Sequence, residues 1–241
     1  MEAQLKSSIL YRSTKIIMNK LSIIIPHRYM ESRSANYDFV LSWYKDLFPE
    51  AEIISADDPN PKFNRGRALD AGVKQSSGDI LIFGDGDLLV SPKSLHTAIK
   101  EIQELNVGFI VPFTRVAYLD AAAAKKVIKG GILKENYPNT TFWKQPSTGG
   151  INILKRSSYD DCFGFEPRFE GWGFEDSAFD ASMQCLVAPT RWLDGPSYHL
   201  HHPSYRNGSS VDHKAGIALC DRYRQAIKDR DAMTAIIGER K

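Results

Sequence analysis

The sequence predicts an α/β protein with a mostly parallel central sheet, helices on both faces of that sheet, and an irregular carboxy-terminal half. Two observations lead to this expectation. From residue 21 to residue 112, short apolar runs alternate with segments of helical periodicity, which is typical of parallel strands joined by crossover helices. Beyond residue 112 the pattern weakens, and residues 130–150 are rich in Gly, Pro, Asn and Thr. With 241 residues, 42% of them hydrophobic, the chain can form one large core.

Each element of the first half has its own signal. Residues 21–26, Leu-Ser-Ile-Ile-Ile-Pro, are typical of a buried strand, and Tyr37, Val40 and Tyr44 fall on one face of a helix. Ser91 followed by proline is a favourable helix start. The expected strands are 21–26, 52–55, 79–83 and 107–112, and the expected helices are 33–48, 63–75 and 91–105.

The second half is expected to hold fewer regular elements, all in a single domain that covers 19–240. The segment 130–145, which contains Trp143, is a candidate lid, and a closed lid excludes water from a site. Residues 1–18 are expected to form an extended or disordered tail, with Met18 as a candidate start of the functional chain. The expected elements are strands at 150–154 and within 192–202, and helices at 157–163, 174–186 and 211–229.

Composition and charge argue against several classes of protein. The net charge of +2, from 31 basic and 29 acidic residues, provides no general attraction to nucleic acid. Cys162, Cys185 and Cys220 are scattered, which argues against a disulfide framework or a zinc cluster and fits a reducing compartment. No apolar run approaches the roughly 18 residues that span a bilayer, and the first residues lack the apolar core of a secretory signal. We therefore expect a cytoplasmic protein without a transmembrane segment.

Two carboxylates, Asp85 and Asp87, follow the expected strand 79–83 directly. The carboxyl end of a central strand is where open α/β sheets bind their ligands. Hard oxygen donors on either side of Gly86 suit a divalent cation that keeps water and phosphate oxygens among its ligands. Asp-Gly is also a common surface turn, so this interpretation needs support from the rest of the chain.

Four motifs, in order along the chain, provide that support. Together they resemble the GT-A-fold nucleotide-sugar glycosyltransferases of the family 2 type, and the carboxy-terminal half resembles the β-1,4-galactosyltransferase and polypeptide N-acetylgalactosaminyltransferase group. The resemblance covers residues 21–205. The motifs are Ser-Ile-Ile-Ile-Pro-His-Arg at 22–28, Phe-Asn-Arg-Gly-Arg-Ala-Leu-Asp-Ala-Gly at 63–72, the strand and acidic triplet at 78–87, and the segment 149–176, which begins with Gly-Gly and ends with Gly-Trp-Gly-Phe-Glu-Asp.

The resemblance implies a Rossmann-like domain in which 19–112 bind a nucleotide sugar and 113–240 carry the acceptor and catalytic groups. A UDP-sugar is the expected donor, and Mn²⁺ is the expected cation, with Mg²⁺ as the alternative. Asp85 and Asp87 would hold the cation, and a histidine would be the third protein ligand. By analogy with the family, that ligand is His199 or His202. Strand alternation puts His199 and His201 on one face, so the choice among the three histidines stays open.

The donor site is expected at the ends of the strands. The segment 26–28 would wrap the base and ribose, while Asp57 or Asp58 would accept a hydrogen bond from the uracil or the ribose. Arg65 would pair with a phosphate through its planar fork, although surface ion pairing is the alternative for Arg28 and Arg65. The expected donor-binding residues are Pro26, His27, Arg28, Asp57, Asp58, Arg65, Asp85, Gly86 and, for a close backbone approach to the sugar, Gly149 and Gly150.

The acceptor site is expected at the Gly-Trp-Gly turn and the acids that follow it. The resemblance makes Asp176 the base that deprotonates the acceptor hydroxyl, a role worth about 10²- to 10⁴-fold in rate, and Glu175 a residue that holds acceptor hydroxyls. A positioned base favours inversion at the sugar carbon. Trp172 and Gly173 would contact the acceptor. The alternatives are a Trp172 packed in the core and two acids that only complement a helix dipole.

Other functions stay open as alternatives. A glycan or surface polysaccharide is the expected acceptor, whereas a phage-type enzyme would modify a hydroxymethylated DNA base, with Lys125, Lys126, Lys129 and Lys134 as a local phosphate patch. A nucleotide-sugar-binding protein without catalysis is disfavoured because both acidic pairs are present. An oxidoreductase would need Gly-x-Gly-x-x-Gly after the first strand. A nucleotidyltransferase would need a glycine- and basic-rich triphosphate loop there.

Overall fold

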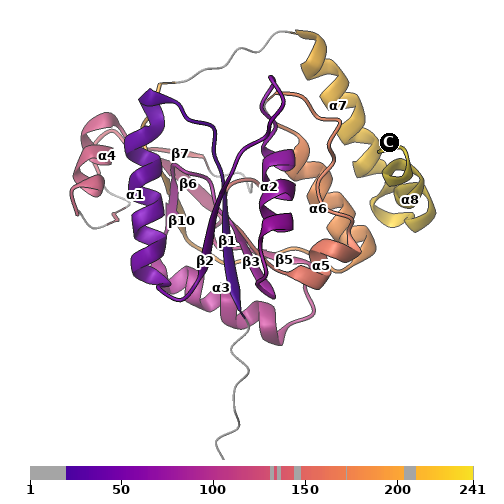
Figure 1. Ribbon diagram of the computed structural model, residues 1–241, viewed down its shortest axis with the longest axis horizontal. Coiled ribbons are helices and arrows are strands. Elements are labelled where there is room, and N and C mark those ends of the chain that lie inside the picture. The colour runs from indigo at the N-terminus through magenta and orange to yellow at the C-terminus, as the bar shows by residue number, and fades with distance from the viewer. Residues whose placement is uncertain are drawn as a thin grey trace, which may run out of the picture.

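A computed structural model describes residues 20–130, 133–134, 137–143, 148–171, 173–203 and 210–240. In this part of the chain, a six-stranded and a four-stranded sheet are surrounded by helices (Figure 1). The tail expected at 1–18 lies outside the described residues. Among the described helices, none has the length and apolar character that a bilayer crossing requires.

The larger sheet has the strand order β2-β1-β3-β8-β5-β9. β1 pairs in parallel with β2 and β3, β5 pairs in parallel with β9, and β8 is antiparallel to both of its neighbours. Every strand except β8 therefore points the same way, and the predicted mostly parallel α/β fold is confirmed. The strands are β1 (Leu21–Pro26), β2 (Glu52–Ala56), β3 (Ile80–Phe83), β5 (Phe109–Val111), β8 (Asn152–Lys155) and β9 (Arg191–Trp192).

The smaller sheet, of order β4-β10-β6-β7, was not predicted as a sheet. β10 lies between β4 and β6, so it sets the histidine segment against the residues that follow the acidic triplet. Strands this short leave too few positions for alternation to show, and their partners are far apart in the sequence. The strands are β4 (Leu88–Val90), β6 (Arg115–Tyr118), β7 (Thr141–Trp143) and β10 (Pro196–His199).

The helices of the first half begin at capping residues or close to the predicted starts. The Asn64 side chain accepts a hydrogen bond from Arg67 N, so α2 (Arg65–Gln75) begins two residues later than predicted. Ser91 caps α3 (Pro92–Glu104) as predicted. α1 (Glu31–Leu47) begins earlier than predicted, which brings Arg33 into its first turn.

The helices of the second half are more numerous than predicted. α4 (Ala121–Ile128) was not predicted. The closing helix expected at 211–229 is observed as α7 (Ser210–Gln225) and a 3₁₀ turn (Ala226–Lys228), and α8 (Arg230–Gly238), which follows beyond the predicted end, was not predicted. α8 is a separate helix because the Asp229 side chain accepts from Ala232 N and starts it. α5 (Arg156–Asp161) and α6 (Glu175–Leu186) lie near their predicted places, and α6 to α8 lie on the opposite side of the molecule from α4 (Figure 1).

The register of the parallel strands places three loops at one edge of the larger sheet. Pro26 is paired with Ala56 and Ile24 with Phe83, so the loops after β1, β2 and β3 begin side by side. The residues at these pairing positions are almost completely buried, apart from Pro26. The packed sheet therefore provides a rigid support for the polar residues that follow each strand.

Candidate active site

Asp87 and two histidines face one another where the smaller sheet meets the end of β3. The pairing of β4 with β10 sets His199 opposite Leu88. His202 Nε2 lies 3.2 Å from Asp87 Oδ2, and His199 Nε2 lies 3.8 Å from Asp87 Oδ1. One possible ligand atom from each of the three residues lies within 4.8 Å of the others. A carboxylate with two imidazoles suits an ion such as Mn²⁺, so these side chains fit the predicted cation.

The structure distinguishes between the three neighbouring histidines. β10 ends at His199, so the alternation that was expected to put His201 on the same face does not continue. His201 is exposed, and its charge acts on Asp120 at the start of α4. The chain then turns to bring His202 to Asp87, and buried Asn36 holds the turn by donating to His201 O at 3.1 Å.

Hydrogen bonds prepare these groups to hold a cation. His202 Nδ1 lies 2.9 Å from Pro203 O, and when this nitrogen donates, Nε2 of the neutral ring keeps a lone pair on the side of Asp87. Before a cation binds, the protonated ring of His202 instead donates a hydrogen bond to Asp87. Burial opposes charge on Asp87, but this hydrogen bond and the interaction with His199 outweigh it and lower the pKa of Asp87. Burial also lowers the pKa of His199, which favours the neutral, ligating form of its ring.

Asp85 lies beside an arginine and outside the group formed by Asp87 and the histidines. Its Oδ1 accepts from Arg65 Nε at 2.6 Å. Arg65 Nη2 donates to Gly150 O at 3.0 Å, and Arg65 Nη1 is buried without a hydrogen-bond partner among the described residues. The guanidinium thus has one N–H group left to contact an anion next to Asp85.

Glu175 and Asp176 begin α6 directly after a strained turn. Phe174 precedes them with a φ of 76°, in the left-handed region that bulky residues rarely adopt. Glu175 is 5% exposed, and its Oε2 is buried without a partner among the described residues. Burial, reinforced by the charge of Asp176, raises the pKa of Glu175 to about 7. Asp176 is more exposed, and its Oδ1 accepts from Ser177 N at 2.8 Å.

Arg65 interacts electrostatically with Asp85 of the first acidic pair and with both acids of the second pair, Glu175 and Asp176. The charges of Asp85, Glu175 and Asp176 all act to raise the pKa of Arg65, against the effect of its burial. Asp85 in turn acts on Glu175. The metal-binding candidates and the base candidates, which lie far apart in the sequence, therefore share one site.

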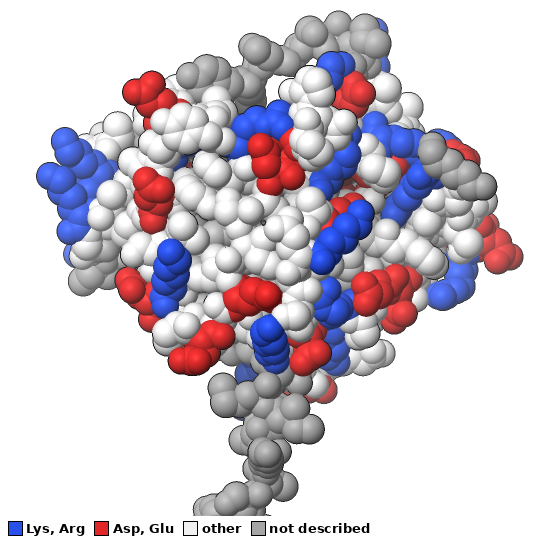
Figure 2. Space-filling model, viewed as in Figure 1, with Lys and Arg blue, Asp and Glu red and all other residues white. Residues whose placement is uncertain are grey.

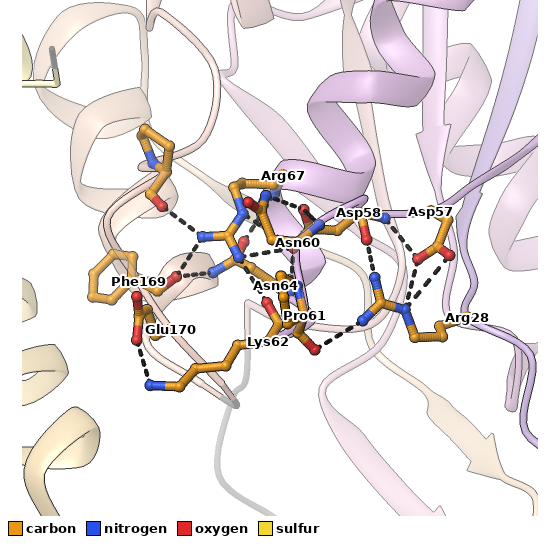
Figure 3. A network of polar contacts seen from close by, with 11 residues as sticks. Arg28, Asp57, Asp58, Asn60, Pro61, Lys62, Asn64, Arg67, Phe169 and Glu170 are labelled. Atoms are coloured by element: carbon orange, nitrogen blue, oxygen red, sulfur yellow. Dashed lines mark hydrogen bonds and ion pairs between the residues drawn. The ribbon is translucent and has the colours of Figure 1, made fainter.

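The segment 26–28 lies at the end of β1, at the same edge of the larger sheet as the loops after β2 and β3. The ring of His27 stacks on Tyr37 with 3.6 Å between ring centroids. Arg28 Nε donates to Asp57 Oδ1 at 3.1 Å, and Arg28 Nη1 donates to Pro61 O at 3.2 Å (Figure 3). The Arg28 ion pair that was the alternative to nucleotide binding therefore exists, although both side chains of the pair keep about a third or more of their surface exposed.

Asp58 differs from its neighbour because it is completely buried and fully engaged. Its Oδ2 accepts from Asn64 N and from Arg67, both at 2.8 Å, and its Oδ1 accepts from the Asn60 side chain at 2.6 Å (Figure 3). These bonds overcome the burial and lower the pKa of Asp58 to about 2. Asp57 and Asp58 were the two predicted nucleoside contacts. Asp58 is buried and holds the loop in shape, whereas the Asp57 side chain is exposed and can contact a ligand.

Sequence reasoning missed two residues of the site. Arg33 Nη1 lies 3.7 Å from Asp87 Oδ2, and its Nε is buried without a partner among the described residues. Tyr37 supports His27 and also borders Gly86, where an added Cβ would lie 3.0 Å from the Tyr37 ring. The signal was the position of both residues in the helix after the first strand, but only the packing of α1 in the folded chain shows that Arg33 lies beside Asp87 and Tyr37 beside His27.

Some predicted residues can be placed only in part. Trp172 lies outside the described residues, and Gly173 beside it has a φ of 96°. The predicted lid 130–145 is described in part, and its Trp143 belongs to β7 with 51% of its surface exposed. Gly150 has a φ of 97°, and an added Cβ would lie 2.5 Å from Leu88, so this position requires glycine.

Basic and acidic side chains are mixed over the face of the molecule that Figure 2 shows, apart from a basic cluster at its left edge over α4. α4 carries Lys125 and Lys126, and Lys129 follows its end; all three are exposed. The cluster is local and no basic stripe runs across this face, so it lends no support to a nucleic-acid acceptor.

Comparisons with known proteins agree with this geometry. Residues 46–165, just under half of the chain, match the family model described as glycosyl transferase family 2. No curated protein matches the sequence. A Drosophila β1,4-galactosyltransferase 7 mutant in complex with manganese, UDP-Gal and xylobiose is similar, with a TM-score of 0.55 and 16% identity over 82% of this chain and 79% of that chain.

Two further solved structures are similar. Glucosyl-3-phosphoglycerate synthase from Mycobacterium tuberculosis, in complex with Mn²⁺, UDP-glucose and phosphoglyceric acid, has a TM-score of 0.51 and 14% identity over 87% of this chain and 80% of that chain. GalNAc-T7 with UDP, GalNAc and Mn²⁺ has a TM-score of 0.53 and 11% identity over 92% of this chain and 55% of that chain.

Fold and family match together define the class: the chain has the GT-A fold of nucleotide-sugar glycosyltransferases. The protein is a glycosyltransferase related to family 2, as the four sequence motifs predicted.

Proposed function

We propose that the protein transfers a sugar from a UDP-sugar to a hydroxyl group of a glycan or surface polysaccharide, with a divalent cation and with inversion. The observation that carries this proposal is the ion pair of Arg65 with Asp85. Arg65 interacts electrostatically with the Glu175–Asp176 pair, and Asp85 interacts with Asp87 and His199 of the candidate metal group. The similar structures named above hold UDP or a UDP-sugar together with Mn²⁺, which supports the donor and cation class.

The donor is held by the residues of 19–112 together with the histidines and the Gly149-Gly150 backbone. Asp87, His199 and His202, with Asp85 close by, would hold Mn²⁺ or Mg²⁺, which would supply a Lewis acid for the charge of the leaving diphosphate. Arg65 Nη1 and Arg33 bind phosphate oxygens, since both have buried nitrogens without partners among the described residues. The His27–Tyr37 stack and Asp57 lie next to the base and ribose.

The acceptor is activated by the acids at the start of α6. Asp176 takes the proton of the attacking hydroxyl, because it is the more exposed of the two acids in the first turn of α6. Glu175, with its raised pKa and free Oε2, holds an acceptor hydroxyl. Trp172 and Gly173, which precede these acids in the sequence, are the residues proposed to contact the acceptor.

A screen of nucleoside-diphosphate sugars with Mn²⁺ tests the proposal. The true donor should raise the melting temperature, because a ligand at about 100 times its Kd stabilises a protein by about 2.7 kcal/mol. It should also be hydrolysed slowly in the presence of Mn²⁺. A panel in which no UDP-sugar has either effect contradicts the proposed function.

The base is tested by Asp176→Asn. This variant should bind the donor and the cation as the wild type does, and should lose transfer by about 10²-fold or more, the contribution of a general base. Normal turnover by Asp176→Asn would show that another group takes the proton.

A further inference from the structure

The turn before the catalytic acids is bonded to the start of α2. Arg67 Nη1 donates to Pro167 O at 2.9 Å and to Phe169 O at 3.2 Å, and Asn64 Nδ2 donates to Phe169 O at 2.6 Å. These bonds, some of which Figure 3 shows around Phe169, join segments about a hundred residues apart. They fix the carbonyl groups of the turn that leads to Glu175 and Asp176.

The same guanidinium is bonded to the loop after β2, here called the donor loop (residues 57–62). Arg67 Nε and Nη2 donate to Asp58 Oδ2 at 3.0 and 2.8 Å, and Nη2 also donates to Lys62 O at 2.8 Å. Arg28, a candidate nucleotide contact, donates to Pro61 O of this loop and to Asp58 O. One rigid fork thus touches both the donor loop and the turn that carries the acids (Figure 3).

The turn is held from its other side as well, and it is strained. Glu166, 1% exposed, accepts from Arg168 at 2.8 Å and from Tyr223 of α7 at 2.5 Å. Between Glu166 and α6, the glycines at 171 and 173 and then Phe174 all have positive φ. Glycine adopts such angles freely, but Phe174 is strained there, and a strained residue persists only where its surroundings hold it. The contacts that anchor this turn therefore help to set the position of the acids that follow Phe174.

We propose that Arg67 is a positioning residue that couples the donor loop to the Glu175–Asp176 turn. The inference rests on the proposed function. A nucleotide that binds at Arg28 and Asp57 must stiffen or shift the donor loop, and Arg67 cannot follow this loop without moving the carbonyls of Pro167 and Phe169. Lysine cannot replace it, because a single ammonium lacks the fork that reaches Asp58 and both carbonyls together.

Hydrogen exchange of the full chain, with UDP and Mn²⁺ as the probe, tests the coupling. In the wild type, UDP should slow exchange both in the donor loop and in peptides covering 163–176. In Arg67→Lys, UDP should bind with unchanged affinity and protect the donor loop, but no longer protect 163–176. Transfer, measured with the acceptor that the wild type uses, should fall about 10- to 100-fold in kcat while the donor KM stays the same, as expected for misplaced acids.

Two further variants complete the experiment. Arg191→Lys alters an arginine–carboxylate pair with Glu101 far from this turn and should behave as the wild type does. Asn64→Ser keeps an N-cap oxygen but loses the amide that reaches Phe169 O, so it should weaken the protection of 163–176 even if Arg67→Lys does not fold.

The outcomes separate the two proposals. The coupling is overturned if UDP slows exchange only in the donor loop of the wild type. It is also overturned if UDP still slows exchange fully in 163–176 of the Arg67→Lys variant. Wild-type protein that binds no UDP in the presence of Mn²⁺ contradicts the proposed function instead.

Discussion

Glu175 is a buried carboxyl group whose environment disfavours its charge. Burial is the main cause and the neighbouring Asp176 adds to it, while Arg65 opposes them without cancelling them. The free Oε2 has no partner among the described residues that would offset this cost. A buried carboxyl of this kind is a candidate for chemistry rather than a source of stability, because an unpaired buried carboxylate destabilises a fold.

Glu175→Gln should therefore stabilise the protein at high pH. The folded-state pKa of about 7 lies above the ordinary value of 4.5, so the folded protein keeps a proton that the unfolded chain loses, and the wild type becomes less stable as pH rises through this window. Without metal, the variant should exceed the wild type by on the order of 1–3 kcal/mol above the window and lose this advantage below it. Urea unfolding at several pH values measures the difference, and a pH-independent difference would contradict the assignment.

Single substitutions also separate the three histidines. His202→Ala should weaken Mn²⁺ binding at least about tenfold, Asp87→Ala should abolish it, and His201→Ala should leave it unchanged because its exposed ring lies outside the group.

Since the hydrogen bond to Asp87 raises the pKa of His202, Mn²⁺ must displace a proton, and its affinity should fall as pH is lowered through that pKa. Calorimetric titration at several pH values measures both effects. Equal losses for His201→Ala and His202→Ala would contradict the site.

At the scale of elements, α7 supports the strained start of α6. The Phe174 ring lies against Gly216 of α7, where an added Cβ would lie 2.9 Å from the ring, and it also contacts the ring of His213. The close approach of the two helices therefore holds Phe174 in its left-handed conformation. This contact explains how a bulky residue can precede the two acids without relaxing to an ordinary backbone conformation.

Gly216→Ala tests this support. Alanine is favoured by the helix by about 1 kcal/mol, but its Cβ must push Phe174 away, so transfer should fall about 10-fold or more while stability changes little. Transfer assays with the acceptor that the wild type uses, together with melting curves, measure the two effects. Gly238→Ala is the matched control, because nothing lies within 4 Å of a Cβ added there. Full activity in Gly216→Ala would show that the Phe174 contact does not position the acids.

At the scale of the whole molecule, the last described residues lock the carboxy-terminal helices to the middle of the chain. Arg240 Nη1 donates to Phe163 O at 2.7 Å, and Arg240 Nη2 donates to Tyr223 Oη at 3.0 Å. Glu239 accepts from Arg168 at 2.9 Å and from Arg222. Together with buried Glu166, these groups form a network between the 163–170 segment and α7 and α8.

Arg240→Ala should destabilise the fold by about 1–3 kcal/mol, because it removes a charge partner of buried Glu166. Arg191→Ala, which breaks an exposed pair with Glu101, should cost no more than about 1 kcal/mol. Denaturant unfolding compares the two variants. Equal small losses would mean that the network contributes no more than an ordinary surface ion pair.

The sequence by itself determined the parallel half of the fold and the chemistry of the site. The apolar runs at 21–26 and 79–83 could only be buried strands, and the residues that follow parallel strands must meet at one edge, so Asp85 and Asp87 were placed correctly relative to the segment 26–28. These inferences needed only local periodicity and the rule for strand ends.

The tertiary structure alone decided the smaller sheet and the contacts that depend on it. β10 lies within the strand expected at 192–202, but β4, β6 and β7 were not predicted, and no local pattern shows which strands pair with β10. The fold of this segment brings His202, and not His201, beside Asp87. The burial of Asp58 and the approach of Arg33 to Asp87 likewise follow from packing between distant segments. A sequence pattern reports which residues can do chemistry, but the partner of each charged group is fixed only when the chain is folded.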